Sequence, residues 1–476
     1  PWGSVLPLAV LTLLLYVVIR CFGGDAINGG SQIALLSATS VCVMLAIGIY
    51  RCKWAVLEEA IIDNIRASAS AIIILLLIGA IAGSWMVSGV VPTMIYYGLK
   101  ILHPSFFLVA SCAICAGVSL MTGSSWTTIA TIGVALMGIG QAMGFPEGWI
   151  AGAIISGAYF GDKISLLSDT TVLASSTVGV PIFTHIRYML YTTVPSFVIA
   201  LAVFVIAGLT LDHTGGTHAG MYAESLRGTF RITPWLLAVP VATGVLIVRK
   251  LPAIVTLFCA AVFACIAMLL AQPELVAKVA GVGGLDFMSG FKGVLMSCFG
   301  PTAIPTGSPQ LDELVATRGM AGMLNTVWLI ICAMCFGGVM TGSGMLGALT
   351  SVFLRFVRRA FSAVASTVGA GIFFNLCTAD QYISIILSGR LFRELYAEQG
   401  LEPRLLSRSV EDSATVCSVL VPWNSCGMTQ ATVLGVSTFV YMPYCIFNIV
   451  SPLMSLAVAA IGWKIKRAAG SAAHPH

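Results

Sequence analysis

Three charged residues lie within eight positions of one apolar stretch, Asp162, Lys163 and Asp169 in GAYFGDKISLLSDTTVLASS (157–176). A charged side chain at the centre of a membrane helix costs about 2.5–3.5 kcal/mol on insertion scales, unless it is paired or solvated. A carboxylate in a polar cavity can bind a cation, and removal from water also favours its protonated form. One aspartate could therefore hold a metal ion and a proton in turn.

Hydroxyl groups surround these charges, and Ser168 or Asp169 could cap a new helix before the apolar VLASS run. A helix broken in this way turns carbonyl oxygens, hydroxyls and carboxylates toward one point, and hard cations such as Na⁺ prefer oxygen ligands. Two simpler interpretations stay open. Asp162 could pair with Lys163, or both could lie in a short loop at the membrane surface.

Other polar interruptions of apolar runs are TGSSWTT (122–128), TADQY (378–382) and VPWNSCG (421–427). Such interruptions are typical of discontinuous helices that line a cavity, although helix caps and turns have the same composition. Arg390 follows SIILSG closely enough to reach a cavity and hold an organic carboxylate. The candidate ion- and substrate-binding residues are Asp162, Asp169, Ser168, Thr170, Thr171, Ser124, Ser125, Trp126, Asp380, Gln381, Asp412, Asn424 and Ser425, with Asp162 and Asp169 as candidate Na⁺ ligands.

The composition requires these elements to lie in a membrane. The 476 residues are 58% hydrophobic and 9% charged, whereas a soluble domain is about 25% charged. Apolar runs long enough to span a bilayer recur at 5–22, 31–50, 68–91, 186–209, 251–271, 323–347 and 441–463. We predict an all-α integral membrane protein with about twelve crossings, some of them discontinuous.

Charge and motifs exclude several function classes. The net charge of +5 comes from basic residues that flank apolar runs, which indicates cytoplasmic loops of a multi-pass membrane protein and no nucleic-acid partner. The first apolar run lacks a basic n-region and a cleavage site, so we expect no secretory signal. Without H-E-x-x-H, G-x-S-x-G or G-x-x-x-x-G-K-[ST], a membrane-embedded hydrolase or an ATP-driven pump lacks its usual chemistry, and we expect neither an enzyme nor a cofactor.

Internal similarity predicts two repeats. IGAIAGSWMVSGVV (78–91) resembles CFGGVMTGSGMLGAL (335–349), and AGVSLMTGSSW (116–126) resembles AGIFFNLCTADQY (370–382). A weaker match sets SDTTVLAS (168–175) beside EDSATVCS (411–418), which gives Asp169 an acidic mate in Asp412.

Basic loops predict how the repeats are oriented. Loop 51–66 precedes the run at 68–91, whereas Arg355, Arg358 and Arg359 follow the run at 323–347. If both loops are cytoplasmic, the matched runs cross in opposite directions. We therefore expect inverted-topology repeats over 1–210 and 234–476, joined by an extracytoplasmic loop 211–233, with the site between them near the midplane.

Four stretches closely resemble signature sequences of the NhaC family of Na⁺/H⁺ antiporters: TGSSWTTIATIG (122–133), SGAYFGDKISLLSDTT (156–171), DQYISIILSGRLFRELYAEQGL (380–401) and SRSVEDSATVCSVLVPWNSCG (407–427). They run in order through most of the chain. This sequence departs from the pattern at SLLSD, where relatives often carry a proline, and at SSWTT, where a glycine is usual. The resemblance implies exchange of Na⁺ or Li⁺ for protons across the cytoplasmic membrane. Similar proteins also exchange malate and lactate, so coupled exchange of a small organic anion is the alternative.

We thus predict a secondary transporter that works by alternating access, with Asp162 and Asp169 as shared cation and proton sites. Ser124, Ser125, Thr170, Asp380 and Asp412 would supply ligands or support, and Lys163 a fixed counter-charge. The expected partners are the lipid bilayer, monovalent cations and protons; a small carboxylate substrate and a homodimer are left open. A passive channel would instead need a continuous polar pore.

Overall fold

The computed structural model describes residues 2–22, 29–211, 215–249, 251–284, 286–306, 312, 315–355 and 359–465. Within these residues the chain is helical, and the only β-type pairing is an isolated bridge between Thr302 and Thr317. Arg358, which we placed in a cytoplasmic loop, lies outside the described residues.

The first half contains α1 (Trp2–Phe22), α2 (Gly30–Gly48), α3 (Trp54–Val87), α4 (Val90–Ile101), η2 (Pro104–Phe106), α5 (Phe107–Thr122), α6 (Ser125–Thr128), η3 (Ile129–Gly133), α7 (Val134–Ala142), α8 (Glu147–Ile164), α9 (Asp169–Val178) and α10 (Ile182–Thr210). A middle section follows with α11 (Gly215–Thr229), η4 (Pro234–Leu237), α12 (Ala238–Val248), α13 (Ala253–Ala271), α14 (Pro273–Ala280) and α15 (Phe287–Phe299). The second half contains η5 (Met320–Met323), α17 (Leu324–Gly342), α18 (Met345–Arg355), α19 (Ala360–Thr378), α20 (Gln381–Glu398), α21 (Pro403–Val410), η6 (Glu411–Thr415), η7 (Ser418–Leu420), α22 (Ser425–Leu434), α23 (Thr438–Tyr441), η8 (Met442–Tyr444) and α24 (Ile446–Ile461).

The helices have the length and composition of membrane spans. Eight of those described are long and apolar enough to cross a bilayer, and the number reaches 11 if each of three bent helix pairs counts as one span. The α8–α9 pair is bent by 46°. Large apolar side chains such as Val198 and Ile206 on α10, and Phe258 and Leu270 on α13, are exposed on the outside, where lipid would cover them. The expected all-helical membrane protein with broken helices is confirmed.

Helix ends repeat at a fixed spacing along the chain. Gly123 ends α5 in the left-handed conformation with φ 67°, and Ala379 ends α19 with φ 56°. Gly179 caps α9 and Gly435 caps α22 in the same conformation. Both pairs are separated by the same 256 positions, from 123 to 379 and from 179 to 435. The two halves therefore contain the same succession of helices and breaks.

This spacing corrects one of the sequence matches. Ser168 caps α9 and Asn424 caps α22, so Asp169 and Ser425 are the equivalent first residues of these helices. Asp412 instead lies in η6. The match of Asp169 with Asp412 was therefore wrong. It rested on similar residue types and did not take the positions of the helix caps into account.

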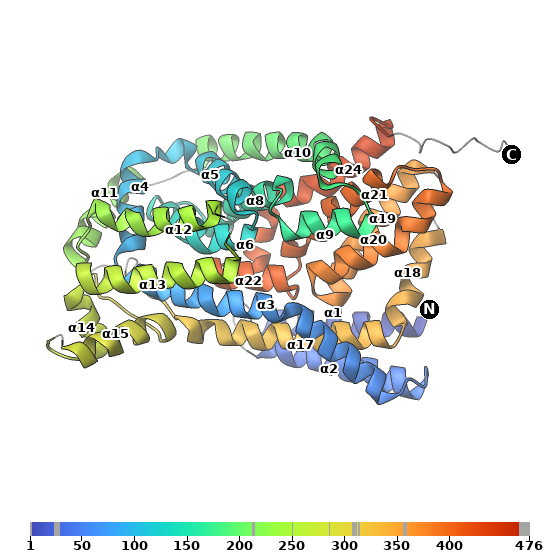
Figure 1. Ribbon diagram of the computed structural model, residues 1–476, viewed down its shortest axis with the longest axis horizontal. Coiled ribbons are helices and arrows are strands. Elements are labelled where there is room, and N and C mark those ends of the chain that lie inside the picture. The colour runs from blue at the N-terminus through green and yellow to red at the C-terminus, as the bar shows by residue number, and fades with distance from the viewer. Residues whose placement is uncertain are drawn as a thin grey trace.

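The matched helices α3 and α17 pack against each other in opposite directions. A Cβ on Gly338 would lie 2.7 Å from the Cα of Ile61, and one on Gly79 would lie 2.8 Å from the Cα of Met320. The contacts thus run in opposite order along the two helices, which lie side by side in Figure 1. Antiparallel packing of matched spans is what inverted-topology repeats produce.

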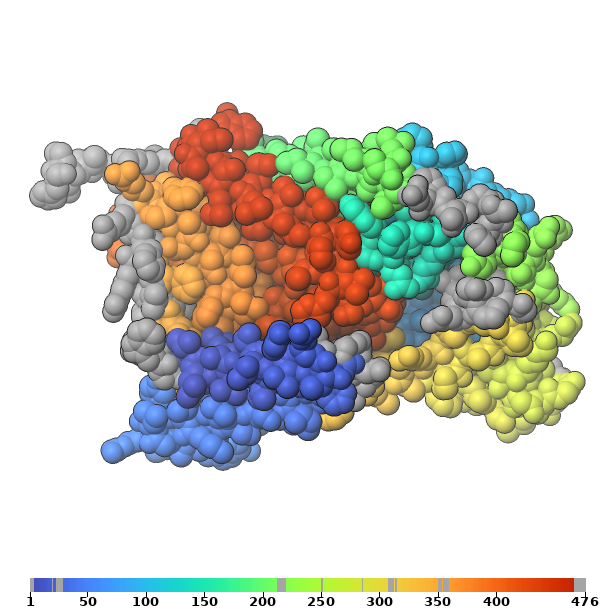
Figure 2. Space-filling model, turned by 180° about the vertical axis from the view of Figure 1, so that it is seen from behind, coloured from blue at the N-terminus to red at the C-terminus, as the bar shows by residue number. Residues whose placement is uncertain are grey.

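Further helices flank this repeated unit. α1 and α2 form a layer along one edge of the molecule, seen in blue in Figure 2. Residues 211–233, expected as a connecting loop, include α11. Along the chain, α11–α15 lie between the two sets of matched helices.

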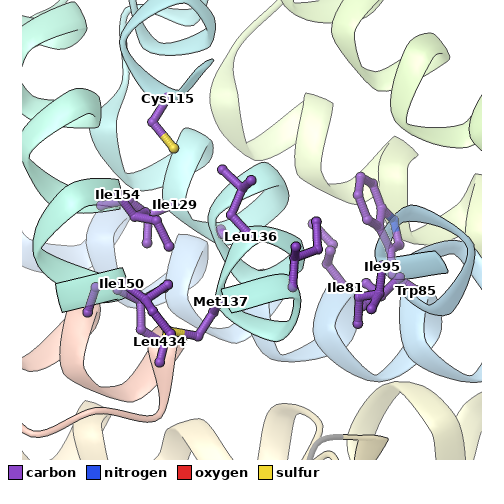
Figure 3. Packing of buried hydrophobic residues seen from close by; sticks show 14 of the residues in the cluster. Ile81, Trp85, Ile95, Cys115, Ile129, Leu136, Met137, Ile150, Ile154 and Leu434 are labelled. Carbon is purple, nitrogen blue, oxygen red and sulfur yellow. The ribbon is translucent and has the colours of Figure 1, made fainter. Parts of the chain in front are cut away.

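Apolar packing holds the broken helices in place. Figure 3 shows Ile129 and Met137, from the helical segment after the first break, beside Ile150 of α8 and Leu434 of α22. All four side chains are buried in one cluster. Because close-packed interiors resist displacement, the breaks are held in a defined geometry.

Candidate cation-binding site

Two helix breaks meet at the centre of the first repeat. The break between α5 and α6 lies at Gly123 and Ser124, and the break between α8 and α9 spans residues 165–168. A Cβ on Gly123 would lie only 2.6 Å from the carbonyl carbon of Leu167, and the residue has a positive φ. Glycine is required here for both reasons.

Side-chain hydroxyl groups form hydrogen bonds with the backbone groups that these breaks leave without helical partners. Ser124 Oγ accepts a hydrogen bond from the Thr127 amide at 3.2 Å, and Ser168 Oγ accepts one from the Thr171 amide at 3.4 Å. Thr171 Oγ1 donates to the Lys163 carbonyl at 3.0 Å. Helix capping therefore accounts for Ser168 and Thr171, whereas Ser124 both caps a helix and lines the cavity described below.

Asp162 lies where the two breaks cross. Its Oδ2 accepts hydrogen bonds from the Ser125 amide at 3.1 Å and from Ser125 Oγ at 2.7 Å. The residue is 7% exposed, and Ser168 and Asp169 are its further polar neighbours. The carboxylate is thus oriented by the start of α6 and remains at the edge of a cavity.

In the second repeat two helix breaks cross in a related way, but different side chains form the hydrogen bonds between them. Asp380 caps α20, because its Oδ1 accepts from the Tyr382 and Ile383 amides at 2.9 and 3.0 Å, and its Oδ2 accepts from Ser425 Oγ at 3.1 Å. Ser418 Oγ donates to Gln381 Oε1 at 3.3 Å.

These contacts occupy equivalent positions in the two repeats. Ser125 and Gln381 match at the common spacing, as do Asp162 and Ser418. The hydrogen bond from Ser125 to Asp162 therefore has a counterpart from Ser418 to Gln381, with donor and acceptor exchanged. The repeats keep the crossing but place the carboxylate on different helices.

Both repeats face one cavity of about 600 Å³. Asp162, Asp169 and Asp380 each contribute to its wall, and no Lys, Arg or His belongs to the described residues that line it. Ser68 of α3 and Thr256 of α13 add hydroxyl groups. A cavity with three carboxylates and many other oxygen atoms attracts cations, and oxygen ligands are those that hard cations prefer.

Seven of the predicted residues line the cavity and others support it from behind. Those that line the cavity are Ser124, Trp126, Asp162, Asp169, Thr170, Asp380 and Gln381. Ser125 and Ser425 lie behind the wall and donate to its carboxylates. Asn424 donates to Asn375 Oδ1 at 3.1 Å and joins the two helices there.

Asp412 and Lys163 lie apart from the cavity wall. Lys163 Nζ forms an ion pair with Asp412 Oδ1 and donates to Ser451 Oγ at 2.9 Å. Arg408 Nε is 3.9 Å from Asp412 Oδ2, and all three charged side chains are fully buried. Lys163, expected as a fixed counter-charge, is therefore the counter-charge of Asp412, and the ion pair with Asp162 that the sequence left open is not formed among the described residues. Arg390 is exposed and is not among the residues that line the cavity.

Sequence reasoning missed several groups near this centre. Ser68 and Thr256 lie in ordinary apolar spans, where nothing in their neighbourhood marks them. Glu411 and Arg408 had a usable signal, because SRSVEDS carries three charges beside an apolar run. No group of three or more His, Cys, Asp or Glu among the described residues is arranged to hold a metal ion. A cation in the cavity would therefore be coordinated by one or two carboxylates together with hydroxyl and carbonyl oxygens.

Known proteins resemble this chain over most of its length. The model of the Na⁺/H⁺ antiporter family matches residues 157–463. The Na⁺/H⁺ antiporter NhaC of Alkalihalophilus pseudofirmus is 35% identical over 425 residues, which cover 89% of each chain. The malate-2H⁺/Na⁺-lactate antiporter of Bacillus subtilis is 35% identical and covers 91% of this chain and 88% of its own. The arginine/ornithine antiporter ArcD of Halobacterium salinarum is 33% identical, and the match covers 97% of this chain and 92% of its own. The family match and these relatives span most of the sequence, and the chain belongs to the Na⁺/H⁺ antiporter family.

Proposed function

We propose that this protein exchanges Na⁺ or Li⁺ for protons across the cytoplasmic membrane, with Asp162 as the residue that holds the cation. The observation that carries the proposal is the charge of the cavity. Three carboxylates line it and the described lining contributes no cationic side chain. A cation entering this cavity gains Coulomb energy, whereas a lone anion would be repelled.

The position of Asp162 supports coupling of Na⁺ to protons at this residue. Ser125 orients the carboxylate through two hydrogen bonds to Oδ2. An ionised carboxylate in a mostly buried place is costly, so Asp162 favours a bound partner, which is either Na⁺ or a proton. When one leaves, the other takes its place. The two ions then compete for one residue and cannot cross on it together.

The arrangement of the repeats supports alternating access. The cavity wall contains helix ends from both, with Asp162 from the first and Asp380 from the second. A rocking motion of one repeat against the other would expose the cavity to each side of the membrane in turn. The antiparallel α3 and α17 are a suitable interface for this motion, because small residues such as Gly338 allow close backbone contact.

Exchange of a small organic solute is the second candidate, because the cavity is larger than a bare ion needs. A volume of about 600 Å³ lies within the range of small-molecule sites, about 300–1,000 Å³. Relatives named for malate, lactate, arginine and ornithine match about as well as NhaC. An organic anion would need Na⁺ at the carboxylates as its counter-ion, whereas a cationic amino acid could bind them directly.

A transport assay separates these functions. Purified protein is placed in liposomes with a pH-sensitive dye inside, and Na⁺, Li⁺, K⁺, malate, lactate or arginine is added alone. Proton movement with Na⁺ or Li⁺ alone supports the proposal. A requirement for one of the organic solutes would favour the second candidate, and the absence of any response to Na⁺ or Li⁺ would contradict cation–proton exchange.

A further inference from the structure

Glu411 is a fully buried carboxyl group that the exchange described above does not use. The residue has 0% exposure and begins the π-helical turn η6. Neither of its carboxylate oxygens makes a hydrogen bond of normal geometry in the part of the chain that the structure describes, although the hydroxyl groups of Thr170 and Thr415 approach them. π-Helical turns are rare and frequently mark functional positions.

The charges around Glu411 leave it without a direct ion pair. Lys163 contacts Asp412, and Arg408 approaches the same aspartate. No described ion pair involves Glu411 itself, although Lys163 acts on it electrostatically. The charged groups that act on Glu411 from another helix are Asp162 and Lys163 of α8. Arg408 and Asp412 lie beside it in its own helical segment, and His185 of α10 lies near Lys163 and Asp412.

Packing does not require a carboxyl group at this place. The equivalent position of the first repeat, at the common spacing, is Ile155, which is also fully buried. An apolar side chain therefore fills the same place in the related helix. An unpaired ionised carboxylate is strongly disfavoured in such surroundings, so a proton or a nearby cation would stabilise Glu411.

Glu411 lies directly behind the cavity wall. Thr170, which lines the cavity, and Asp162 are among the groups that act on it. A cation bound at Asp162 would attract the ionised form of Glu411 and so favour loss of its proton. We propose that Glu411 is a second proton-carrying residue of the exchange and releases its proton when Na⁺ binds at Asp162. This inference rests on the proposed function of Asp162.

The test counts the protons that the protein releases when it binds Na⁺. Purified protein in weakly buffered detergent solution receives NaCl, or choline chloride as a salt control, and the pH change gives the protons released per protein. Binding of radioactive Na⁺ is measured on the same samples. We expect Glu411→Gln to bind Na⁺ and to release one proton fewer than the wild type. Glu411→Asp, which keeps a titratable group, should restore the wild-type number.

A matched control is Glu402→Gln. Glu402 precedes α21 and forms an ion pair with Arg404, away from the cavity. This variant should release the wild-type number of protons. If wild-type protein releases none on Na⁺ binding, the proposed function itself fails. If the wild type and Glu411→Gln release equal numbers, the proposed function stands and the role of Glu411 is overturned.

Infrared spectroscopy decides the question if Glu411→Gln does not fold. The difference spectrum with and without Na⁺ should show the loss of a protonated-carboxyl band, and this band should shift in Glu411→Asp. Identical carboxyl bands in the wild type and Glu411→Asp would overturn the proposal.

Discussion

Replacement of Asp162 by Asn removes the charge that we assign to cation binding and leaves the local structure in place. The amide oxygen of Asn can still accept the hydrogen bonds that Ser125 donates at 3.1 and 2.7 Å. Burial of a neutral amide also costs less than burial of a charge. We therefore expect Asp162→Asn to fold and to be purified in wild-type amounts.

The expected effect on binding follows from Coulomb's law. Two unit charges about 4 Å apart attract each other by about 4 kcal/mol at an effective dielectric constant of about 20. Loss of one charge would then weaken Na⁺ binding by about a thousandfold, since each 1.4 kcal/mol is about tenfold in Kd. Na⁺-driven proton movement in liposomes should be lost as well.

The matched control is Asp63→Asn, whose side chain is 59% exposed and pairs with Arg66 on the surface. Surface pairs contribute about 0–1 kcal/mol, so this variant should bind and exchange Na⁺ as the wild type does. Binding is measured by calorimetry or with radioactive Na⁺, and antiport with a pH-sensitive dye. Wild-type Na⁺ affinity in correctly folded Asp162→Asn would refute the reasoning, because the charge at the crossing of the two breaks would then not hold the ion.

Three other predictions test competition, topology and the helix break. The apparent KM for Na⁺ in the liposome assay should rise as the pH falls while the maximal rate changes little, because protons and Na⁺ compete for one carboxylate; a KM that stays constant with pH would mean separate sites. Single cysteines at Arg51 and Arg359, in a background without reactive cysteines, should both react with impermeant reagents only from the cytoplasmic side, and labelling from opposite sides would contradict the inverted repeats. Gly123→Ala should lower Tm far more than Gly435→Ala, because both residues have positive φ but only Gly123 has a neighbouring backbone at 2.6 Å; the second change should cost only about 1–2 kcal/mol, and equal Tm losses would show that the contact is unimportant.

The structure changes the relative weight of the two candidate aspartates. The sequence offered Asp169 an acidic mate in Asp412, and it offered Asp162 a simple structural partner in Lys163, so both observations favoured Asp169 as the ion-binding residue. Both reasons fail, since Asp412 lies elsewhere in the second repeat and is itself the partner of Lys163. Asp162 is the buried and oriented carboxylate, whereas Asp169 is exposed.

The class of the protein and the positions of its helix breaks are predictable from the amino-acid sequence. Apolar runs of bilayer length require membrane helices, because unsatisfied backbone groups are too costly in lipid. Local signals such as Gly123 with Ser124, or Asp380 before α20, mark helix ends wherever the chain folds, because caps depend on neighbouring residues. The family resemblance followed from the same stretches and is confirmed.

Which charged side chains contact each other depends on how the helices pack and is not predictable from local sequence. Lys163 pairs with a residue 249 positions away, and Asp162 shares a cavity with Asp380 of the other repeat. Glu411 and Asp412 are neighbours in sequence, yet Asp412 is ion-paired and Glu411 has no ion-pair partner among the described residues. The physical reason is that the energy of a buried charge depends on the groups around it in space, which helix packing brings together from distant parts of the chain.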